Sequence, residues 1–119
     1  MATDRVERLV TSKRKRHPEL RQPVTYQGIR AVCDREGILV MHGPLPFAGA
    51  TVSYRGRHVI MVDPRRSPRR ETYAIAHELG HVWLHADDEP AVRHMEEPWP
   101  DDPREDEAEA VATMLLQGW

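Results

Sequence analysis

The chain has 119 residues, with 17 Lys or Arg and 19 Asp or Glu, and its net charge is -2. This is the length of a single domain with one core, so we treat residues 1–119 as one domain. The single cysteine excludes an internal disulfide and a Cys-rich zinc module, and no apolar run approaches the roughly 20 residues that a membrane-spanning helix needs. The first ten residues lack the apolar run of a signal peptide, so we expect a cytoplasmic protein that does not contact a membrane.

The charge is divided unevenly along the chain. Residues 1–72 hold 15 basic and 7 acidic side chains, a net charge of +8. Residues 73–119 hold 2 basic and 12 acidic side chains, a net charge of -10. The acidic half would attract a divalent cation, whereas the basic half would attract nucleic acid or an acidic partner.

The first 22 residues are basic and carry few apolar side chains. The run Lys13-Arg14-Lys15-Arg16 is followed by a proline-containing linker. This composition is typical of a flexible basic arm or a short helix. Because basic runs of this kind are usually solvated, we do not expect direct nucleic-acid binding.

The segment from Thr25 to Glu36 predicts a helix. Ile29, Val32 and Cys33 fall at i, i+3 and i+4 and form one apolar stripe. We expect Cys33 to be a small core residue, because nothing nearby beyond scattered arginines would activate its thiol.

Three strand-like runs follow, at residues 38–41, 50–54 and 58–62. The second and third runs are separated by Arg55-Gly56-Arg57, a candidate tight turn, and predict a hairpin.

A central helix is predicted from Ser67, as N-cap, and Pro68, at the first helical position, to about His85. It contains His77-Glu78-Leu79-Gly80-His81, the pattern H-E-x-x-H. Two histidines four residues apart lie one above the other on a helix, so both rings can reach one metal ion. Glu78 lies about a quarter turn away, where it can take a proton from a metal-bound water.

Residues 87–101 are acidic and proline-containing, and predict a loop beside the site. A last helix, at residues 103–117, begins with Asp102 as N-cap. Its apolar stripe is formed by Ala108, Val111, Ala112, Leu115 and Leu116.

A catalytic zinc site needs a third protein ligand. His85 continues the histidine series, but its Cα would lie about 12 Å from that of His77 along a straight helix. Glu107 lies four residues before Val111 and borders the buried stripe, so we expect it to be the third ligand. Glu109 is rotated about 200° from Glu107 and is expected to face solvent. For Glu105, in the first turn, a capping role is sufficient.

Four stretches occur in the order typical of one known family: the strand with its aspartate (59–63), the arginine-to-histidine segment (70–81), the trailing His85, and the acidic helix (105–116). Through these stretches the chain resembles the ImmA/IrrE family of metallopeptidase-like domains over about residues 37–116. Tyr73 and Val111 stand where the family usually has phenylalanine, and the chain stops just past the leucine pair, Leu115 and Leu116.

The resemblance implies an α+β, zincin-like fold, in which a three-stranded, mostly antiparallel sheet packs against the H-E-x-x-H helix and a C-terminal helix bearing a glutamate ligand. It implies His77, His81 and Glu107 as metal ligands and Glu78 as the catalytic base. The ligand types favour Zn²⁺, although Mn²⁺ would also accept two histidines and a glutamate. The candidates for further contacts to substrate or transition state are Tyr73, His85, His94 and Arg70.

The activity implied by the resemblance is that of a metallo-endopeptidase acting on a helix-turn-helix transcriptional repressor, often one of a mobile element. The strand at 50–54 offers an edge to which an extended substrate would add. The alternative is a non-catalytic binding module, or one half of a toxin–antitoxin pair, on the same fold. An intact Glu78 disfavours this alternative, because a structural metal site has no need of a base.

Overall fold

The computed structural model describes residues 2–21, 23–46, 48–85, 92–94 and 103–117. The described elements are, in chain order, α1 (Ala2–Arg16), the 3-10 helix η1 (Pro18–Leu20), α2 (Tyr26–Arg35), β1 (Leu39–His42), β2 (Gly49–Tyr54), β3 (Arg57–Val62), α3 (Pro68–His85), β4 (Val92–His94) and α4 (Pro103–Leu115). None of the described helices is both long and apolar enough to cross a bilayer.

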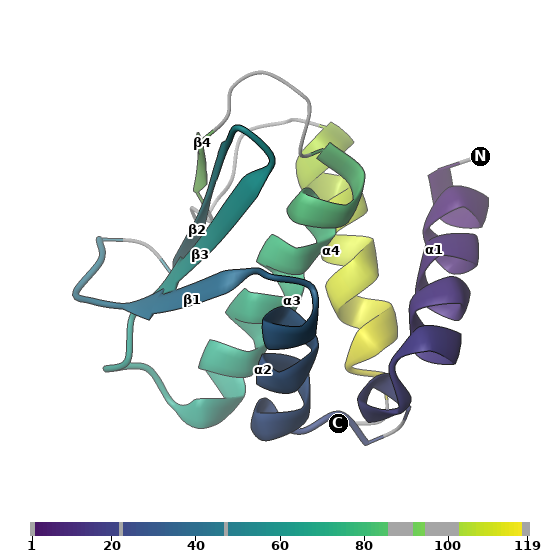
Figure 1. The fold of residues 1–119 in the computed structure, drawn as a ribbon, viewed down its shortest axis with the longest axis horizontal. Helices are drawn as coiled ribbons and strands as arrows, with labels where there is room; N and C mark the ends of the chain where they lie inside the picture. Colours follow the sequence, from purple (N-terminus) through teal and green to yellow (C-terminus); the bar gives the residue numbers. More distant parts are fainter. Residues whose placement is uncertain (1, 22, 47, 86–91, 95–102, 118–119) are drawn as a thin grey trace.

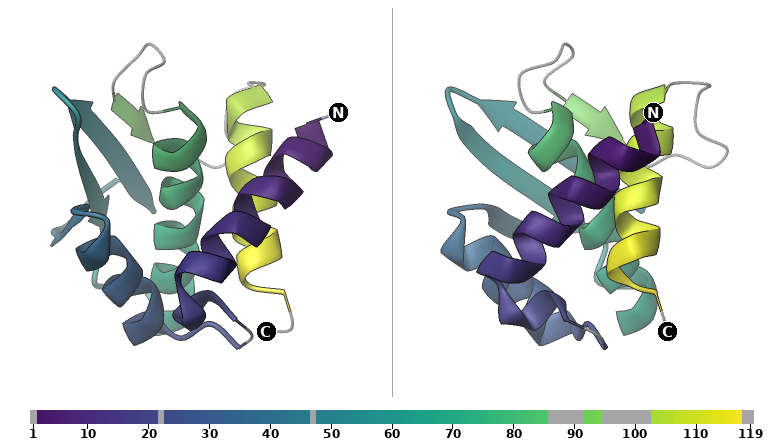
Figure 2. Two further views of the ribbon diagram at one scale, coloured as in Figure 1. Left: turned by 45° about the vertical axis from the view of Figure 1, so that its right-hand side comes forward. Right: turned by 90° about the vertical axis from the view of Figure 1, so that its right-hand side faces the viewer.

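The central helix α3 lies between the sheet and α4, as Figures 1 and 2 show. It packs on β2 and β3 on one side, on α4 on the other, and also on α2. Helix α1 packs on α4. The helix that carries H-E-x-x-H is therefore covered by other elements on several sides.

The sheet has the strand order β1-β3-β2-β4. Strand β1 is parallel to β3, whereas the β2–β3 and β2–β4 pairs are antiparallel. The predicted α+β class and mostly antiparallel sheet are thus confirmed. The fourth strand, β4, was not predicted, because three residues within the segment read as a loop are too few to show an alternating pattern.

Strand β4 also corrects the expectation that β2 offers an edge to a substrate. Ala50, Thr51 and Val52 of β2 pair with His94, Arg93 and Val92 of β4 on one side and with β3 on the other. Over these residues both edges of β2 are already paired. An added strand would have to use another edge of the sheet.

The helix and turn signals in the sequence correspond to local hydrogen bonds. The Thr25 hydroxyl accepts a hydrogen bond from the Gly28 N–H (3.0 Å), and the Ser67 hydroxyl accepts one from the Arg70 N–H (3.3 Å). Between β2 and β3, Arg55 and Gly56 both have positive φ, at 51° and 75°. Two consecutive residues of this kind form the turn that suits the twist of a hairpin.

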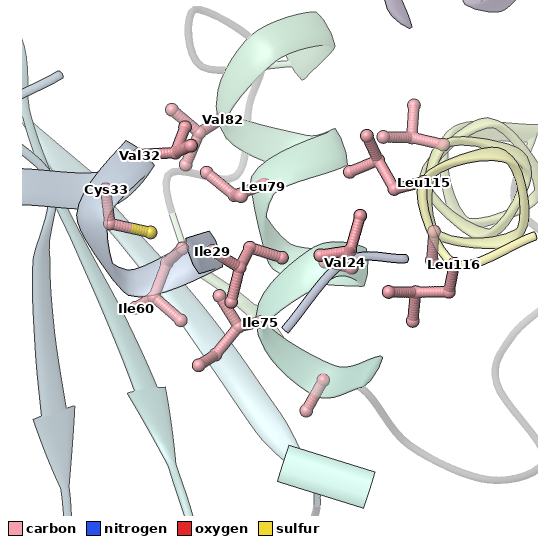
Figure 3. Packing of buried hydrophobic residues seen from close by; sticks show 14 of the residues in the cluster. Val24, Ile29, Val32, Cys33, Ile60, Ile75, Leu79, Val82, Leu115 and Leu116 are labelled. Carbon is pink, nitrogen blue, oxygen red and sulfur yellow. The ribbon is translucent and has the colours of Figure 1, made fainter. Parts of the chain in front are cut away.

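The first helix is anchored through one face. Of the two alternatives for the N-terminal segment, the structure has a helix, with Val6 and Val10 fully buried four residues apart. In the core, Ile29, Val32 and Cys33 of α2 belong to one buried cluster with side chains of β3, α3 and α4 and of the segments before α2 and after α4 (Figure 3). The other members labelled there are Val24, Ile60, Ile75, Leu79, Val82, Leu115 and Leu116.

Candidate metal centre

The two histidines of the motif lie one turn apart on α3, with ring centroids 5.1 Å apart and planes inclined by 70°. Both side chains are buried. Ile75 and Leu79 of the same helix lie in the apolar core, so the histidines occupy the flank that meets α4. The four-residue spacing therefore makes both histidine side chains point from α3 in the same direction.

Glu105, in the first turn of α4, joins this pair. Its Oε2 lies 3.2 Å from His77 Nε2 and 2.6 Å from His81 Nε2. One ligand atom from each of the three residues lies within 4.8 Å of the others, and all three residues are buried. Among the described residues, these three form the metal-competent group.

The expectation that Glu107 would join the histidines is therefore corrected. Glu107 instead contacts His85, whose Nε2 lies 3.0 Å from its Oε1, and Arg5. The reason is the rotation of α4 about its axis. The buried positions of this helix include Glu105, Ala108, Ala112 and Leu115, spaced i, i+3, i+7 and i+10. That spacing is visible in the sequence, but a capping role alone accounts for a glutamate in the first turn, so the sequence does not single out Glu105 as a ligand.

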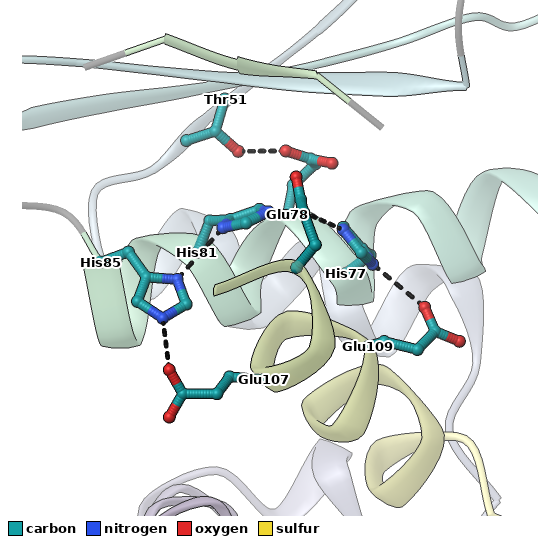
Figure 4. A network of polar contacts seen from close by, with 8 residues as sticks. Thr51, His77, Glu78, His81, His85, Glu107 and Glu109 are labelled. Carbon is teal, nitrogen blue, oxygen red and sulfur yellow. Dashed lines mark hydrogen bonds and ion pairs between the residues drawn. The ribbon is translucent and has the colours of Figure 1, made fainter. Parts of the chain in front are cut away.

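The expectation for Glu109 is also corrected. Its Oε2 lies 3.2 Å from His77 Nδ1, and its Oε1 accepts a hydrogen bond from the Tyr73 hydroxyl. The His77 ring thus lies between two carboxylates of α4, Glu105 at Nε2 and Glu109 at Nδ1. Figure 4 shows the contact between His77 and Glu109. Glu105 and Glu109 are four residues apart and share one face of the helix.

Glu78 points from α3 towards the sheet, and its side chain is fully buried. The Thr51 hydroxyl of β2 donates a hydrogen bond of 2.6 Å to its Oε1. Sequence analysis did not identify Thr51, because the register between a strand and a helix far along the chain leaves no local signal. Gly49, two residues earlier on the strand, lies close to the Glu78 side chain, since a Cβ on this glycine would stand 3.5 Å from Glu78 Cγ.

The remaining candidates lie on α3 and β4. His85 is buried, with Nδ1 3.2 Å from His81 Nδ1. Arg70 is exposed in the first turn of α3, and the structure does not bring it into the group of His77, His81 and Glu105. His94 lies on β4, paired with Ala50.

The electrostatics of the three groups are coupled. Burial alone would raise the pKa of the Glu105 carboxyl, but hydrogen bonds from His77 and His81 outweigh it and lower this pKa to about 2. Burial would lower the pKa of His77, but Glu105 and Glu109 raise it to about 9. For His81, burial dominates and lowers the pKa. The site therefore holds a proton at His77 between two carboxylates, where a cation is also favoured.

The donor set fits a zinc ion. Two imidazole nitrogens and one carboxylate oxygen are the ligands of one class of catalytic zinc site, which keeps its remaining position for water or substrate. The second nitrogen of each histidine also meets a polar group, as metal-bound histidines require. The same donors suit Mn²⁺, so the geometry indicates a metal ion without selecting one.

Comparison with known proteins agrees with this geometry. Residues 33–116 match the IrrE N-terminal-like domain, which defines a peptidase family (Peptidase_M78). No curated protein matches the chain. The match covers most of the chain and includes α3, with its histidines, and the whole of α4. The resemblance drawn from the sequence is confirmed, and the chain belongs to the IrrE N-terminal-like peptidase family.

Proposed function

We propose that the chain is a zinc-dependent endopeptidase, with His77, His81 and Glu105 as protein ligands and Glu78 as the general base. The observation that carries the proposal is the convergence of three buried ligand atoms within 4.8 Å. When bound, zinc supplies Lewis acidity and lowers the pKa of water at its open position.

In this proposal, Glu78 transfers the proton during hydrolysis. Its carboxylate takes a proton from the attacking water and returns it to the leaving amine. The hydrogen bond from Thr51 to Oε1 restrains the carboxylate, so its orientation does not depend on the side-chain torsions of Glu78 alone. The Tyr73 hydroxyl donates a hydrogen bond to Glu109, whose carboxylate also contacts His77. This arrangement supports a role for Tyr73 in orienting Glu109 beside His77, and not a role as an oxyanion donor.

For the substrate, we propose a helix-turn-helix transcriptional repressor in the cytoplasm. Membership of a peptidase family implies a protein substrate. The narrower choice of a repressor, and the link to mobile elements, rest on the likeness to the ImmA/IrrE family alone.

One observation favours a second candidate, a metal-holding binding module without catalysis. The Glu78 side chain is fully buried, and its Oε1 accepts a hydrogen bond from the Thr51 hydroxyl. A base that serves a catalytic water must reach that water. In a binding module without catalysis, the hydrogen bond between Thr51 and Glu78 would instead stabilise the packing of α3 on the sheet.

The test compares the native chain with Glu78→Gln and Glu105→Ala. Zinc content is measured by elemental mass spectrometry, and hydrolysis is measured on labelled casein and on a panel of purified helix-turn-helix repressors. We expect one zinc per native chain, one zinc but no hydrolysis in Glu78→Gln, and loss of zinc in Glu105→Ala. Glu7→Gln, an exposed change on α1, is the matched control and should behave as native.

The outcomes separate the two candidates. Hydrolysis by Glu78→Gln at the native rate would show that Glu78 is not the base. Zinc binding by the native chain without hydrolysis of any repressor or of casein would favour the binding module. A native chain that takes up no zinc would remove the metal centre from both candidates.

A further inference from the structure

The ring of His81 has a second set of contacts on the side opposite Glu105. His81 Nδ1 lies 3.2 Å from Nδ1 of His85, and Nε2 of His85 lies 3.0 Å from Oε1 of Glu107 (Figure 4). His85 is buried and Glu107 is largely covered. A chain of polar contacts therefore runs from His81 through His85 to a carboxylate.

The hydrogen-bonding capacities of these groups determine where their hydrogens lie when His81 binds a metal. A metal-bound Nε2 has no hydrogen, so the hydrogen of the neutral His81 ring is on Nδ1 and needs an acceptor. Nδ1 of a neutral His85 accepts only when its own hydrogen is on Nε2. A hydrogen bond from Nε2 of His85 to the carboxylate oxygen of Glu107 requires that same tautomer of His85.

At the end of this series of polar contacts, Glu107 contacts Arg5 of α1. Nη1 of Arg5 lies 3.3 Å from Oε2 of Glu107, and its Nη2 donates a hydrogen bond of 3.2 Å to the Leu84 carbonyl in the last turn of α3. Arg5 thus ties Glu107 to the helix that carries both histidines. This arginine lies outside residues 33–116, the segment that matches the family.

The two histidines are supported differently. His77 Nδ1 meets the carboxylate of Glu109 directly, at 3.2 Å. His81 has no such direct contact among the described residues, and its Nδ1 reaches the carboxylate of Glu107 only through His85. Removing the imidazole of His85 should therefore leave Nδ1 of His81 without this acceptor.

We propose that His85 and Glu107 are positioning residues, which hold the His81 ring with its hydrogen on Nδ1 and its Nε2 lone pair directed at the metal. The proposal rests on the metal centre proposed above. It assigns to Glu107 a role next to the ligands and not among them. Outer hydrogen-bond partners of this kind typically change metal affinity by about 10- to 100-fold.

The test measures zinc affinity of the full chain by competition with a chromophoric chelator. His85→Leu removes the acceptor and fills a similar volume, whereas His85→Asn places an amide oxygen near the position of Nδ1. We expect about 10- to 100-fold weaker binding in His85→Leu and Glu107→Ala, and recovery of most of the affinity in His85→Asn. Arg8→Gln, an exposed change on α1, is the control and should bind as the native chain does.

A second measurement distinguishes a loss of folding from a loss of the position of the His81 ring. In the zinc-loaded native chain, NMR should detect a ring N–H proton on Nδ1 of His81 that exchanges slowly with water. This signal should persist in His85→Asn and be lost to exchange in His85→Leu, while circular dichroism shows that both variants fold.

Three results would overturn the inference. If His85→Leu and Glu107→Ala bind zinc as tightly as the native chain, the positioning role is wrong and the metal centre stands. If His85→Asn is weakened as much as His85→Leu, the imidazole acts by packing and not as an acceptor. If the native chain binds no zinc, the metal centre and the positioning role fail together.

Discussion

Gly80 of α3 and Ala108 of α4 mark a close approach of the two helices that carry the candidate ligands. A Cβ added at Gly80 would stand 2.8 Å from Ala108 Cα and 3.1 Å from the Ala108 carbonyl oxygen. Only glycine permits backbones to approach this closely. Gly80 immediately precedes His81, and Ala108 lies three residues after Glu105, so this contact brings the carboxylate to the histidines.

Gly80→Ala is therefore expected to separate the two helices. Overpacking against backbone costs about 1–3 kcal/mol, while the better helix propensity of alanine returns about 1 kcal/mol. We expect a net loss of up to about 2 kcal/mol in the free energy of unfolding, measured by urea denaturation, with weaker zinc binding because Glu105 moves with α4. Gly43→Ala, where no atom lies within 4 Å of the added Cβ, is the control. Equal stability and zinc affinity in Gly80→Ala and the native chain would contradict this account.

Zinc binding is expected to release a proton near neutral pH. Before zinc binds, Glu105 and Glu109 raise the pKa of His77, against burial, to about 9, so the ring is protonated at pH 7.5. A metal takes only the unprotonated nitrogen, so binding releases close to one proton from His77 and the affinity rises with pH up to about 9. Titration calorimetry at pH 7.5, in buffers of different ionisation enthalpy, measures this number.

The matched variant for the proton release is Glu109→Gln. It removes one of the two carboxylates that raise the pKa of His77, so fewer protons should be released at the same pH. Binding enthalpies that do not depend on the buffer would show that His77 is neutral before zinc arrives.

The central helix was predictable because its determinants are local. Ser67 and Pro68 mark its start, and the spacing of Ile75 and Leu79 predicts which flank the histidines occupy. These signals depend on residues within a few turns of one another. The observed bounds, Pro68–His85, agree with the prediction.

The choice among the three glutamates of α4 was not predictable in the same way. It depends on the rotation of α4, which is set by the contact of Gly80 with Ala108, and these residues are distant in sequence. The prediction that Glu107 and Glu109 lie about 200° apart around α4 agrees with their separate partners. The prediction that Glu107 is the glutamate that faces the two motif histidines is wrong. Once Glu105 faces the histidines, Glu109 faces them too, and Glu107 turns to His85.

Thr51 and β4 were missed for a related reason. Both depend on pairings across the sheet or between sheet and helix. No short-range pattern in the sequence encodes such a register.

Cys33 is expected to be unreactive in the folded chain. It is fully buried between α2, the sheet and α3, and burial raises the pKa of its thiol to about 12. Ellman's reagent should therefore react only as fast as the chain opens, and at once in urea. Because this is the single cysteine of the chain, the signal has one source. Rapid reaction without denaturant would contradict the packing of α2.

The carboxylate of Glu36 joins three helices. It accepts hydrogen bonds from Lys13 of α1 (3.0 and 3.1 Å) and from Trp83 Nε1 of α3 (3.0 Å), and its Oε2 lies 2.7 Å from His17 Nε2. Burial would raise the pKa of Glu36, but the hydrogen bonds from Lys13, Trp83 and His17 outweigh it and hold this pKa below 4.5. The charged form is therefore favoured in the folded state.

A pKa that is lower in the folded than in the unfolded chain gives stability that is present above the unfolded value. That stability is lost as the pH falls from about 4.5 through the folded value. Glu36→Gln should thus lower the free energy of unfolding by about 1–3 kcal/mol at pH 7, and the difference from the native chain should shrink below pH 4.5. Urea denaturation at a series of pH values measures this difference, with the exposed change Glu7→Gln as control. A difference that stays constant from pH 7 to pH 3 would mean that Glu36 stabilises the three helices by packing and not by its charge.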